Sequence, residues 1–530
     1  MKIRYLISVP VWVLLFVNCN RFSKTEEKAE EKAPNILFVL ADDASFLHMG
    51  KHSPDWVTTP AFDKIVEQGV YFENAYTPNA KCAPSRAAVL TGRNSWQLEE
   101  AANHMAYFPT KFKSFPEVLY ENGYHVGYTG KGYLPGVAYD EKGEKRELLV
   151  KSYNKFKKDA PTSEISDNDY PKNFETFLEK RKEDQPFFFW YGGWEPHRSY
   201  EFGSGLKNGK KLSEVKEVFD FWPKTDSVKT DILDYAFELE YFDSQLEKML
   251  DLLEEKNLIE NTIIVVTSDN GMPFPRIKGQ TYELSNHLPL AIMWPKKIKN
   301  KGRTVKDFVN FIDFAPTFLE FAGISEKESG MEVIEGTSLS DVLFSEESGR
   351  ITTYRDHVLI GKERHDIGRP NNEGYPMRGI IVGDYLYLKN FEVDRWPAGN
   401  PETGYLNCDG GPTKTAILDS KGDGKNVFWE LSFGKRPPEE LYNIKTDPQC
   451  LNNLAGKEDF VSLKEDLYQQ MEDKLKAQND PRILGKGEIF DGYPIYPAKF
   501  MNYYEKYMNG EDTPKLNWVN KSDFRPEDAD

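Results

Sequence analysis

Short apolar runs, each about one strand long, alternate along this sequence with segments that carry a helical pattern. The run from Asn35 to Leu40 is continuous, which is typical of a central strand buried on both faces of a parallel sheet. Strands that alternate with helices predict an α/β fold, in which a mostly parallel sheet is sandwiched by helices. The other expected strands are 124–128, 187–191, 262–267 and 290–294, and the expected helices are 59–68, 115–121, 232–258 and 311–322.

Carboxylates directly follow two of the expected strands. Asp42 and Asp43 come after the first run, and Asp269 and Asn270 come after the run that ends at Thr267. Ligands of open α/β sheets collect at the carboxyl ends of the strands, and two adjacent carboxylates repel each other unless a cation lies between them. Helix capping explains one Asp of the pair but hardly both. Hard oxygen ligands suit Ca²⁺ or Mg²⁺ and are poor for zinc.

The length of the chain, 530 residues, is enough for one large domain and a smaller one. We predict a catalytic domain at 35–345 and a smaller α+β domain with an antiparallel sheet at 346–485, where short runs show half-polar alternation. The tail at 486–530 is rich in Tyr, Pro and Asn and is expected to wrap the surface. The expected strands of the smaller domain are 378–388 and 426–432, and its helix is 460–478.

The formal net charge of the chain is -17. Such acidity argues against non-specific binding of nucleic acid, which needs a basic surface. An anionic substrate would therefore have to be held by a locally basic pocket.

The N-terminus looks like an export signal. A basic start is followed by an apolar run, Tyr5 to Val17, that is too short for a comfortable membrane span. Cys19 follows, so we predict a bacterial lipoprotein signal at 1–19; a plain signal peptide is the alternative, because Asn18 is unusual before a lipidated Cys. The polar stretch 20–34 would be a tether. We expect an exported protein of the periplasm or outer membrane, held to the membrane only through its lipid anchor.

Two cysteines, Cys408 and Cys450, lie in the C-terminal half of the chain. They could pair in an oxidising compartment. Two cysteines alone do not decide between a disulfide and free thiols.

The stretch from Lys81 to Arg93 places a cysteine where a loop meets a helix. Pro84 suits the first turn of a helix, where its missing N–H is not needed, and Gly92 can end that helix. Backbone N–H groups and the helix dipole at such an N-terminus favour negative charge beside Cys82. An isolated cysteine is more often a buried apolar thiol, which is the alternative interpretation.

The spacing C-x-P-S-R-x-x-x-L-T-G-R, from Cys82 to Arg93, resembles the signature of type I sulfatases in the alkaline-phosphatase superfamily. The resemblance extends over about 35–455 and implies an alkaline-phosphatase-like fold. It also implies that a maturation enzyme converts Cys82 to formylglycine (3-oxoalanine), whose oxygen completes the site of one Ca²⁺. By the same resemblance, the protein ligands of that Ca²⁺ are Asp42, Asp43, Asp269 and Asn270.

The same resemblance assigns roles to four further residues. Arg86 would stabilise the hydrated aldehyde at position 82 that attacks sulfur, and Lys131 and Lys278 would neutralise developing charge. His197 would act as the general acid for the leaving group. A lone lysine is more often a solvated surface charge and a lone histidine a structural residue, but each of these follows an expected strand-end loop.

One position departs from the family pattern. The family usually reads G-K-x-H, whereas Tyr133 stands here where the histidine is expected. That histidine helps to release sulfate, and a tyrosine is a poor base at neutral pH. Release would then depend on another group, either His104 or water.

Two segments, Asp269–Pro275 and Gly374–Arg378, resemble heparan N-sulfatase (sulfamidase) and its bacterial relatives. In that family the second segment faces the active site from the C-terminal domain, so residues around it are candidates for binding the sugar. Aromatic residues near the motifs could pack against a sugar ring, although core packing is their commoner role. The predicted substrate-binding residues are Tyr133, Trp194, His287, His365 and Arg378, and the further candidates are Tyr282, Glu363, Arg364, Arg369 and Tyr375.

We therefore expect a calcium-dependent sulfatase that removes sulfate from a sulfated polysaccharide or its oligosaccharides, of the algal ulvan or carrageenan type or a glycosaminoglycan. An N-sulfoglucosamine sulfohydrolase acting on heparan is the nearest alternative, and we rank an O-sulfate slightly higher. A phosphodiesterase of the same superfamily is less favoured, because only one metal's worth of ligands is evident. A glycan-binding lipoprotein that has lost catalysis is the alternative from another class, and Tyr133 is its best support.

Overall fold

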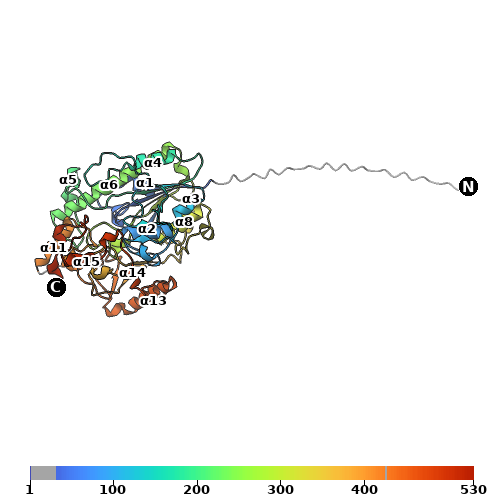
Figure 1. The fold of residues 1–530 in the computed structure, drawn as a ribbon. Coiled ribbons are helices and arrows are strands. Elements are labelled where there is room, and N and C mark those ends of the chain that lie inside the picture. Colours follow the sequence, from blue (N-terminus) through green and yellow to red (C-terminus); the bar gives the residue numbers. More distant parts are fainter. Residues whose placement is uncertain (2–31, 424–426, 530) are drawn as a thin grey trace. The chain divides into compact units, whose positions relative to one another are not determined.

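The central sheet carries most of the residues that the motifs single out. In the computed structural model, which describes residues 1, 32–423 and 427–529, it has seven strands (Figure 1). Only β8 runs antiparallel to its neighbours, so the expected α/β fold with a mostly parallel sheet is confirmed. In spatial order the strands are β4 (His125–Gly130), β6 (Phe187–Gly192), β1 (Asn35–Ala41), β7 (Thr262–Ser268), β8 (Ala291–Met293), β2 (Val70–Tyr76) and β9 (Arg303–Asn310).

Two strands of this sheet, β2 and β9, were not expected from the sequence. They lie at one side of the sheet, where each carries polar residues among the apolar ones. Glu73 and Asn74 are partly exposed in β2, and Lys306 is exposed in β9. These residues break the continuous apolar run by which a buried central strand is recognised.

Helices cover both faces of the sheet. Along β1, Leu37 and Val39 point into one core cluster, which they share with α1 (Pro60–Gln68), α4 (Tyr170–Glu179) and the long α6 (Asp226–Glu255). Ile36, Phe38 and Leu40 point into the other cluster, because successive side chains of a strand alternate between faces. That second cluster contains residues of α2 (Cys82–Thr91), α3 (Phe115–Glu121) and α8 (Phe314–Phe321).

The C-terminal half forms a second, antiparallel sheet of four strands within the described residues, as expected. Its strands are joined in sequence order, and α13 (Val461–Ala477) packs against it through Leu467 and Met471. The single run expected at 378–388 is a hairpin of two strands. The four strands are β10 (His357–Lys362), β11 (Met377–Val382), β12 (Tyr385–Asn390) and β13 (Glu439–Asn443).

The prediction of a strand at 426–432 is wrong, because Val427–Ser432 forms a helix, α12. Trp429 is buried in it, and Phe433 is buried one turn further on. This spacing places both rings on one side of a helix, and the Phe433 ring lies 4.6 Å from that of Tyr405. A short run containing Trp and Phe suits either a strand or a helix, and here the helical contacts decide.

The tail beyond residue 485 contains two short helices, α14 and α15, and packs against earlier parts of the chain (Figure 1). Ile495, Phe500 and Tyr503 share an apolar cluster with Met105 and Leu406. The tail therefore has a core contact of its own. The remaining elements are β3 (Tyr107–Phe108), β5 (Val137–Ala138), α5 (Ser204–Lys207), α7 (Glu283–Asn286), α9 (Glu326–Ser329), α10 (Ser340–Leu343), α11 (Pro412–Ser420), α14 (Ile489–Gly492) and α15 (Tyr503–Met508).

The expected signal at 1–19 and the tether at 20–34 fall almost wholly outside the described residues. No helix in the described part of the chain is both long and apolar enough to cross a membrane. Residues 33–530, which contain both sheets, form one compact unit.

The cysteines of this unit, Cys82, Cys408 and Cys450, are all buried and free. The possible disulfide between the last two is therefore not formed. Burial raises the pKa of Cys450 well above its usual value, so that thiol stays protonated and behaves as an apolar side chain.

We predict that Gly130, the last residue of β4, tolerates no side chain. Its φ is +77°, and a Cβ would lie 1.9 Å from the carbonyl oxygen of Gly192 on the neighbouring strand. Gly130→Ala combines a left-handed backbone with a clash against main chain, so the free energy of unfolding should fall by about 3–5 kcal/mol.

Gly123 provides the matched control, because its φ is +92° and a Cβ there meets nothing within 4 Å. Gly123→Ala should lower the free energy of unfolding by only about 1 kcal/mol. Urea unfolding followed by circular dichroism measures both. Equal losses for the two variants would show that backbone strain alone matters at Gly130.

Candidate active site

The carboxylates predicted to meet at the sheet edge do meet. In the register of β1 with β7, Ala41 lies opposite Ser268, so the residues that follow each strand are neighbours. The backbone N–H of Asp43 donates to Asp269 Oδ1 at 3.1 Å. Asp43 has a φ of 77°, in the left-handed region that a non-glycine residue rarely adopts, and such strain concentrates at functional sites.

The four residues Asp42, Asp43, Cys82 and Asp269 form a cluster suited to a metal ion. One ligand atom from each lies within 4.8 Å of the others, and all four side chains are buried. Asn270 donates from Nδ2 to Asp43 Oδ1 at 2.7 Å, while its Oδ1 is buried without a hydrogen-bond partner. An orphaned oxygen beside three carboxylates fits a hard divalent cation, so the residues present fit the metal site that the sequence predicted.

Three cations surround these carboxylates. Lys131 Nζ lies 2.5 Å from Asp42 Oδ2, and Lys278 Nζ lies 2.7 Å from Asp43 Oδ2. Arg86 donates from Nε to Asp269 Oδ2 at 2.9 Å. Burial alone raises the pKa of Asp42, but Lys131, His197 and Arg86 outweigh it and lower the pKa to about 2. Asp42 is therefore ionised at any physiological pH.

Cys82 begins α2, and its Sγ lies 3.4 Å from Asp42 Oδ1. The residue is only 1% exposed. Burial raises the pKa of its thiol well above the usual value. An unmodified thiol at this position stays protonated, so it is a poor nucleophile.

His197 and Trp194 stand at the border between this cluster and solvent. His197 Nε2 lies 3.9 Å from Asp43 Oδ2, and its side chain is about a quarter exposed. Trp194 is 38% exposed, and Lys131 Nζ lies 5.8 Å from the centre of its ring. A solvent-facing imidazole beside the cluster can exchange protons with a group bound there.

A cavity of about 690 Å³ opens onto Cys82, Lys131, Lys278 and His197. Its volume lies in the range of about 300–1,000 Å³ that is usual for small-molecule sites. Trp194 lines it as well. The other lining residues are Lys81, His104, Met105, Leu134, Pro135, Glu164, Arg198, Ser199, Asp366, Asp409, Gly410, Tyr496, Pro497, Phe500, Asn517, Trp518, Val519 and Asn520.

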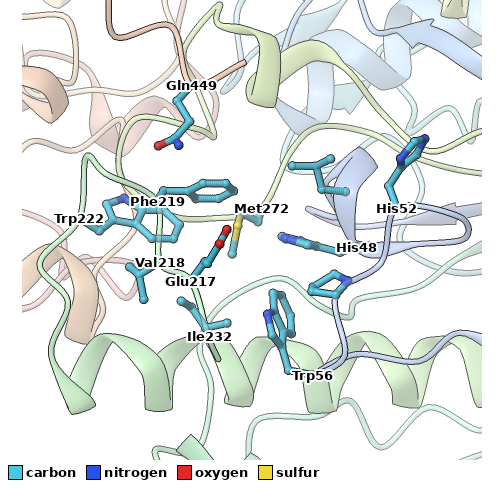
Figure 2. A pocket seen from close by; sticks show the side chains of 12 residues that line it. His48, His52, Trp56, Glu217, Val218, Phe219, Trp222, Ile232, Met272 and Gln449 are labelled. Carbon is cyan, nitrogen blue, oxygen red and sulfur yellow. The ribbon is translucent and has the colours of Figure 1, made fainter. Parts of the chain in front are cut away.

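A smaller cavity, shown in Figure 2, lies elsewhere in the molecule. Its volume is about 230 Å³, and aromatic side chains such as Trp56, Phe219 and Trp222 line it. His48 also lines it, and burial lowers the pKa of that imidazole to about 3, so it is neutral. No lysine or arginine is among the twelve lining residues, so this cavity offers an anion no positive charge.

Arg378 does not face the active site, and the prediction that it binds the sugar is corrected. Its guanidinium is fully buried and pairs with Asp480 at 2.7 Å and Glu363 at 2.7 Å. It also donates to the carbonyl oxygens of Lys362 and Met377. All of its N–H donors point into the second sheet and α13's C-terminal loop, so none is left for a ligand.

The two predicted histidines of the substrate site also have structural surroundings. His287 lies between the rings of Phe46 and Tyr76, and its Nδ1 is 2.6 Å from Glu283 Oε1. His365 is completely buried, with Nε2 2.8 Å from Asn79 Oδ1. Neither lines the cavity as the described residues define it.

Four further candidates likewise serve the interior. Arg364 donates to carbonyl oxygens of the tail, including that of Tyr493 at 2.9 Å, and Arg369 donates to the carbonyl oxygen of Trp396. Tyr282 and Tyr375 are buried, and Tyr282 donates to Glu440 at 3.0 Å. None of the four lines the cavity as the described residues define it.

Tyr133, the departure from the family pattern, is also turned away from this cavity. Its ring packs edge-to-face on Phe108 with 5.2 Å between centroids, and its hydroxyl is buried without a partner. It lines a separate cavity of about 280 Å³. The structure instead places His104 in the lining of the 690 Å³ cavity, where its Nδ1 lies 2.9 Å from Asp366 Oδ1.

The motif search missed two carboxylates that organise the basic residues of the cavity. Asp409 accepts from Lys278 at 2.8 Å, and Asp366 pairs with Lys81 at 2.8 Å. Asp409 stands in the sequence Cys408-Asp409-Gly410, which reads as an ordinary turn. Neither residue belongs to a motif, so only the fold brings them to the site.

Comparison with known proteins identifies the class. The strand ends of this α/β sheet hold a carboxylate cluster beside a buried cysteine at a helix N-terminus, and two lysines and an arginine surround it, which suits an enzyme that acts on an anionic ester. The model of the sulfatase family matches residues 34–324, more than half of the 530 residues, so the chain belongs to the sulfatase family. It is accordingly a sulfuric ester hydrolase.

Its relatives span nearly the whole chain. An ulvan-active sulfatase of Formosa agariphila is 28% identical over 506 residues, which cover 92% of this chain and 88% of that protein. The human N-sulphoglucosamine sulphohydrolase is 24% identical, covering 86% of this chain and 93% of that protein. A solved protein in complex with its substrate D-glucosamine-2-N,6-O-disulfate has a TM-score of 0.60 and 21% identity, covers 85% of this chain and 99% of that one, and shows the same fold.

We predict that Arg378 acts on stability. Arg378→Ala leaves the carboxylates of Glu363 and Asp480 buried beside an unfilled space, so the free energy of unfolding should fall by about 3–5 kcal/mol. Urea unfolding measures this. Arg350, which is exposed, is the matched control, and Arg350→Ala should change the free energy by less than about 0.5 kcal/mol. A stable Arg378→Ala protein with a raised KM for saccharides would restore the original assignment.

Proposed function

We propose that this protein removes sulfate from a sulfated saccharide, with a formylglycine at position 82 and one Ca²⁺ held by Asp42, Asp43, Asp269 and Asn270. The observation that carries the proposal is the convergence of Lys131, Lys278 and Arg86 on the carboxylates around residue 82. When present, the cation supplies positive charge beside the sulfuryl oxygens and the formylglycine supplies the attacking hydroxyl.

The chain's own residues bind and orient the sulfate. Lys131 and Lys278 line the cavity although each is only 3% exposed. Both can move from a carboxylate partner to a sulfate oxygen, which carries the same sign of charge. Arg86 is fixed by Asp269 and by the carbonyl oxygen of Lys131 at 2.8 Å, so it holds the geometry of position 82.

His197 is placed to protonate the leaving oxygen of the saccharide. It lines the cavity next to Trp194, and its Nε2 faces Asp43 at 3.9 Å. A protonated imidazole there donates to an alkoxide as the S–O bond breaks. The sugar that leaves must therefore lie on the side of the cavity that His197 faces.

Tyr133 stands where the family has a histidine that helps to release sulfate. His104 is our candidate for the base that takes over this role. Asp366 holds its Nδ1 at 2.9 Å, and its Nε2 has no hydrogen-bond partner. Burial lowers the pKa of His104 to about 4, so the imidazole is neutral at pH 7 with an open lone pair on Nε2, although it binds a proton more weakly than a solvated histidine does. Its presence in the cavity favours an active hydrolase over a glycan-binding protein that has lost catalysis.

The substrate class rests on the relatives and on the expected export. Two relatives carry names that refer to saccharides, an ulvan-active sulfatase and a sulphoglucosamine sulphohydrolase. We propose an exported lipoprotein, anchored at Cys19 and matured by a formylglycine-generating enzyme, that acts on polysaccharide fragments. We rank an O-sulfate above an N-sulfate. We rank a phosphodiester below both, because the described carboxylate clusters all share Asp42 or Asp43 and are interpreted as the ligands of one metal ion.

A desulfation screen tests this function. Enzyme coexpressed with a maturation enzyme is incubated with defined oligosaccharides of ulvan, carrageenan and heparan, and released sulfate is measured by ion chromatography. We expect sulfate from at least one of them, and peptide mass spectrometry should show formylglycine at position 82. Cys82→Ala should fold normally and release none. Release by protein that contains only unmodified Cys82 contradicts the mechanism.

We predict that Ca²⁺ stabilises the folded protein through the same carboxylates. At a hundredfold excess over its Kd, a ligand that binds only the native state adds about 2.7 kcal/mol, so Ca²⁺ should raise the Tm of metal-free protein in calorimetry. Asp269→Asn should abolish the rise. Asp384→Asn, at an exposed carboxylate, is the control and should keep it. An undiminished rise in Asp269→Asn would place the ion elsewhere.

A further inference from the structure

The C-terminal tail forms a large part of the wall of the active-site cavity. Seven lining residues come from positions 496–520, far in sequence from the motifs of the central sheet. The expectation from sequence was only that this tail wraps the surface. We call these residues the tail wall: Tyr496, Pro497, Phe500, Asn517, Trp518, Val519 and Asn520.

Hydrogen bonds to main-chain carbonyl oxygens hold the tail wall against the rest of the cavity. The backbone N–H of Gly410 donates to the carbonyl oxygen of Trp518 at 2.7 Å, directly beside Asp409. Trp518 Nε1 donates to the carbonyl oxygen of Leu406 at 3.1 Å, and the N–H of Tyr496 donates to that of Met105 at 2.9 Å. The wall is therefore formed before any ligand binds, which lowers the entropy lost on binding.

The anchoring extends beyond the wall. Lys414 and Asp523 form a fully buried ion pair at 3.2 Å, and Arg364 donates to the carbonyl oxygens of Tyr493 and Pro494. Breaking a buried pair of this kind costs about 3–5 kcal/mol. The tail is thus held on both sides of the seven wall residues.

The tail wall carries no charge. Its side chains are aromatic, apolar or amide, and Phe500 packs on Trp518 with 6.0 Å between ring centroids. Trp518 is partly exposed, while Asn517 and Asn520 are exposed. Aromatic faces beside amides form a surface that packs against the C–H face of a sugar ring and hydrogen-bonds its hydroxyl groups.

The cations of the cavity outside its buried end already have partners. Lys81 pairs with Asp366 at 2.8 Å, and Arg198 pairs with Asp231 at 2.7 Å. Lys131 and Lys278 belong to the buried end, where the proposed function has them bind the sulfate itself. In the described part of the chain, a second anionic group on the substrate would find no unpaired lysine or arginine along this lining.

An adjoining cavity of about 290 Å³ adds acceptors on the side that His197 faces. It shares Trp194, His197 and Arg198 with the active site. Glu195 and Glu238, both 1% exposed, line it, and Oε1 of Glu238 is buried without a partner. The oxygens of Glu195 already accept from Ser166 and Tyr170, so Oε1 of Glu238 is the group left to hydrogen-bond a sugar hydroxyl.

We propose that the tail wall is a subsite for an uncharged sugar ring linked to the sulfated unit, so that the enzyme prefers saccharides whose neighbouring residue carries neither sulfate nor carboxylate. This inference rests on the proposed function, because it names the substrate class of the same cavity. Sulfate binds at the buried basic end, and the neighbouring ring packs on Trp518.

The first test compares three substrates that share one sulfated unit: the free monosaccharide, the unit linked to an uncharged sugar, and the unit linked to a uronic acid. The neutral disaccharide should have a kcat/KM at least about tenfold above that of the uronate disaccharide. For wild type and each variant, we compare kcat/KM for the neutral disaccharide with kcat/KM for the monosaccharide. Trp518→Ala should lower this ratio about tenfold. Trp518→Phe, which keeps an aromatic face, should retain that ratio within about twofold.

Tyr507→Ala is the matched control, because Tyr507 is a tail aromatic outside the cavity lining and stacks on Tyr503. It should keep the ratio. Preference for the uronate disaccharide overturns the proposal. So does a loss in Trp518→Phe as complete as in Trp518→Ala, since Trp518 would then act only as an anchor through its N–H.

A binding measurement separates this inference from the proposed function. Saturation-transfer NMR on the full chain uses two unsulfated probes, a neutral galactan hexasaccharide and a hexasaccharide containing uronate. The neutral probe should bind, and Trp518→Ala should abolish its signal. If the neutral probe binds but no sulfate is released from any saccharide, the proposed desulfation of saccharides is wrong and the subsite stands. If sulfate is released but the neutral probe does not bind, the subsite is wrong.

Discussion

The site depends on one interaction, the pairing of buried lysines with the carboxylates that follow β1. Lys131, after β4, reaches Asp42, and Lys278, in the loop after β7, reaches Asp43. Buried ion pairs add little net stability, because desolvation offsets most of their attraction. These ion pairs position the two ammonium groups and Arg86 around one cluster. The same cations can then bind a substrate anion, which is negatively charged like the carboxylates.

The parts of this site that the sequence predicted share a short-range cause. Strand ends bring Asp42 next to Asp269, and the helix that begins at Cys82 has Pro84 in its first turn and Gly92 at its end. The failures share a long-range cause. Arg378 and His287 have side chains suited to a sugar, but Asp480 and Glu283 engage them, and no local pattern marks those partners. Whether an arginine faces solvent or a buried carboxylate is decided by the fold.

The prediction of the fold also succeeded where the signal is short-range and failed where it depends on distant contacts. Apolar runs identified the strands of the sheet that are buried on both faces, whereas β2 and β9 were missed because Glu73, Asn74 and Lys306 interrupt their pattern. The tail gave no periodic signal, yet it supplies a wall of the cavity. The cavity thus joins a charged end built by short motifs to an uncharged wall that only tertiary contacts create.

The burial of Cys82 bears on whether its proposed modification would come before or after folding. All ten residues of α2 are buried, and Cys82 itself is 1% exposed. An enzyme that modified this residue would have to bind the segment around it, and that segment is inaccessible in the folded protein. Under the proposed function, modification of Cys82 would therefore compete with folding of the chain. A molecule that folded first would keep the unmodified cysteine, so the rate of folding relative to modification would set the yield of active protein.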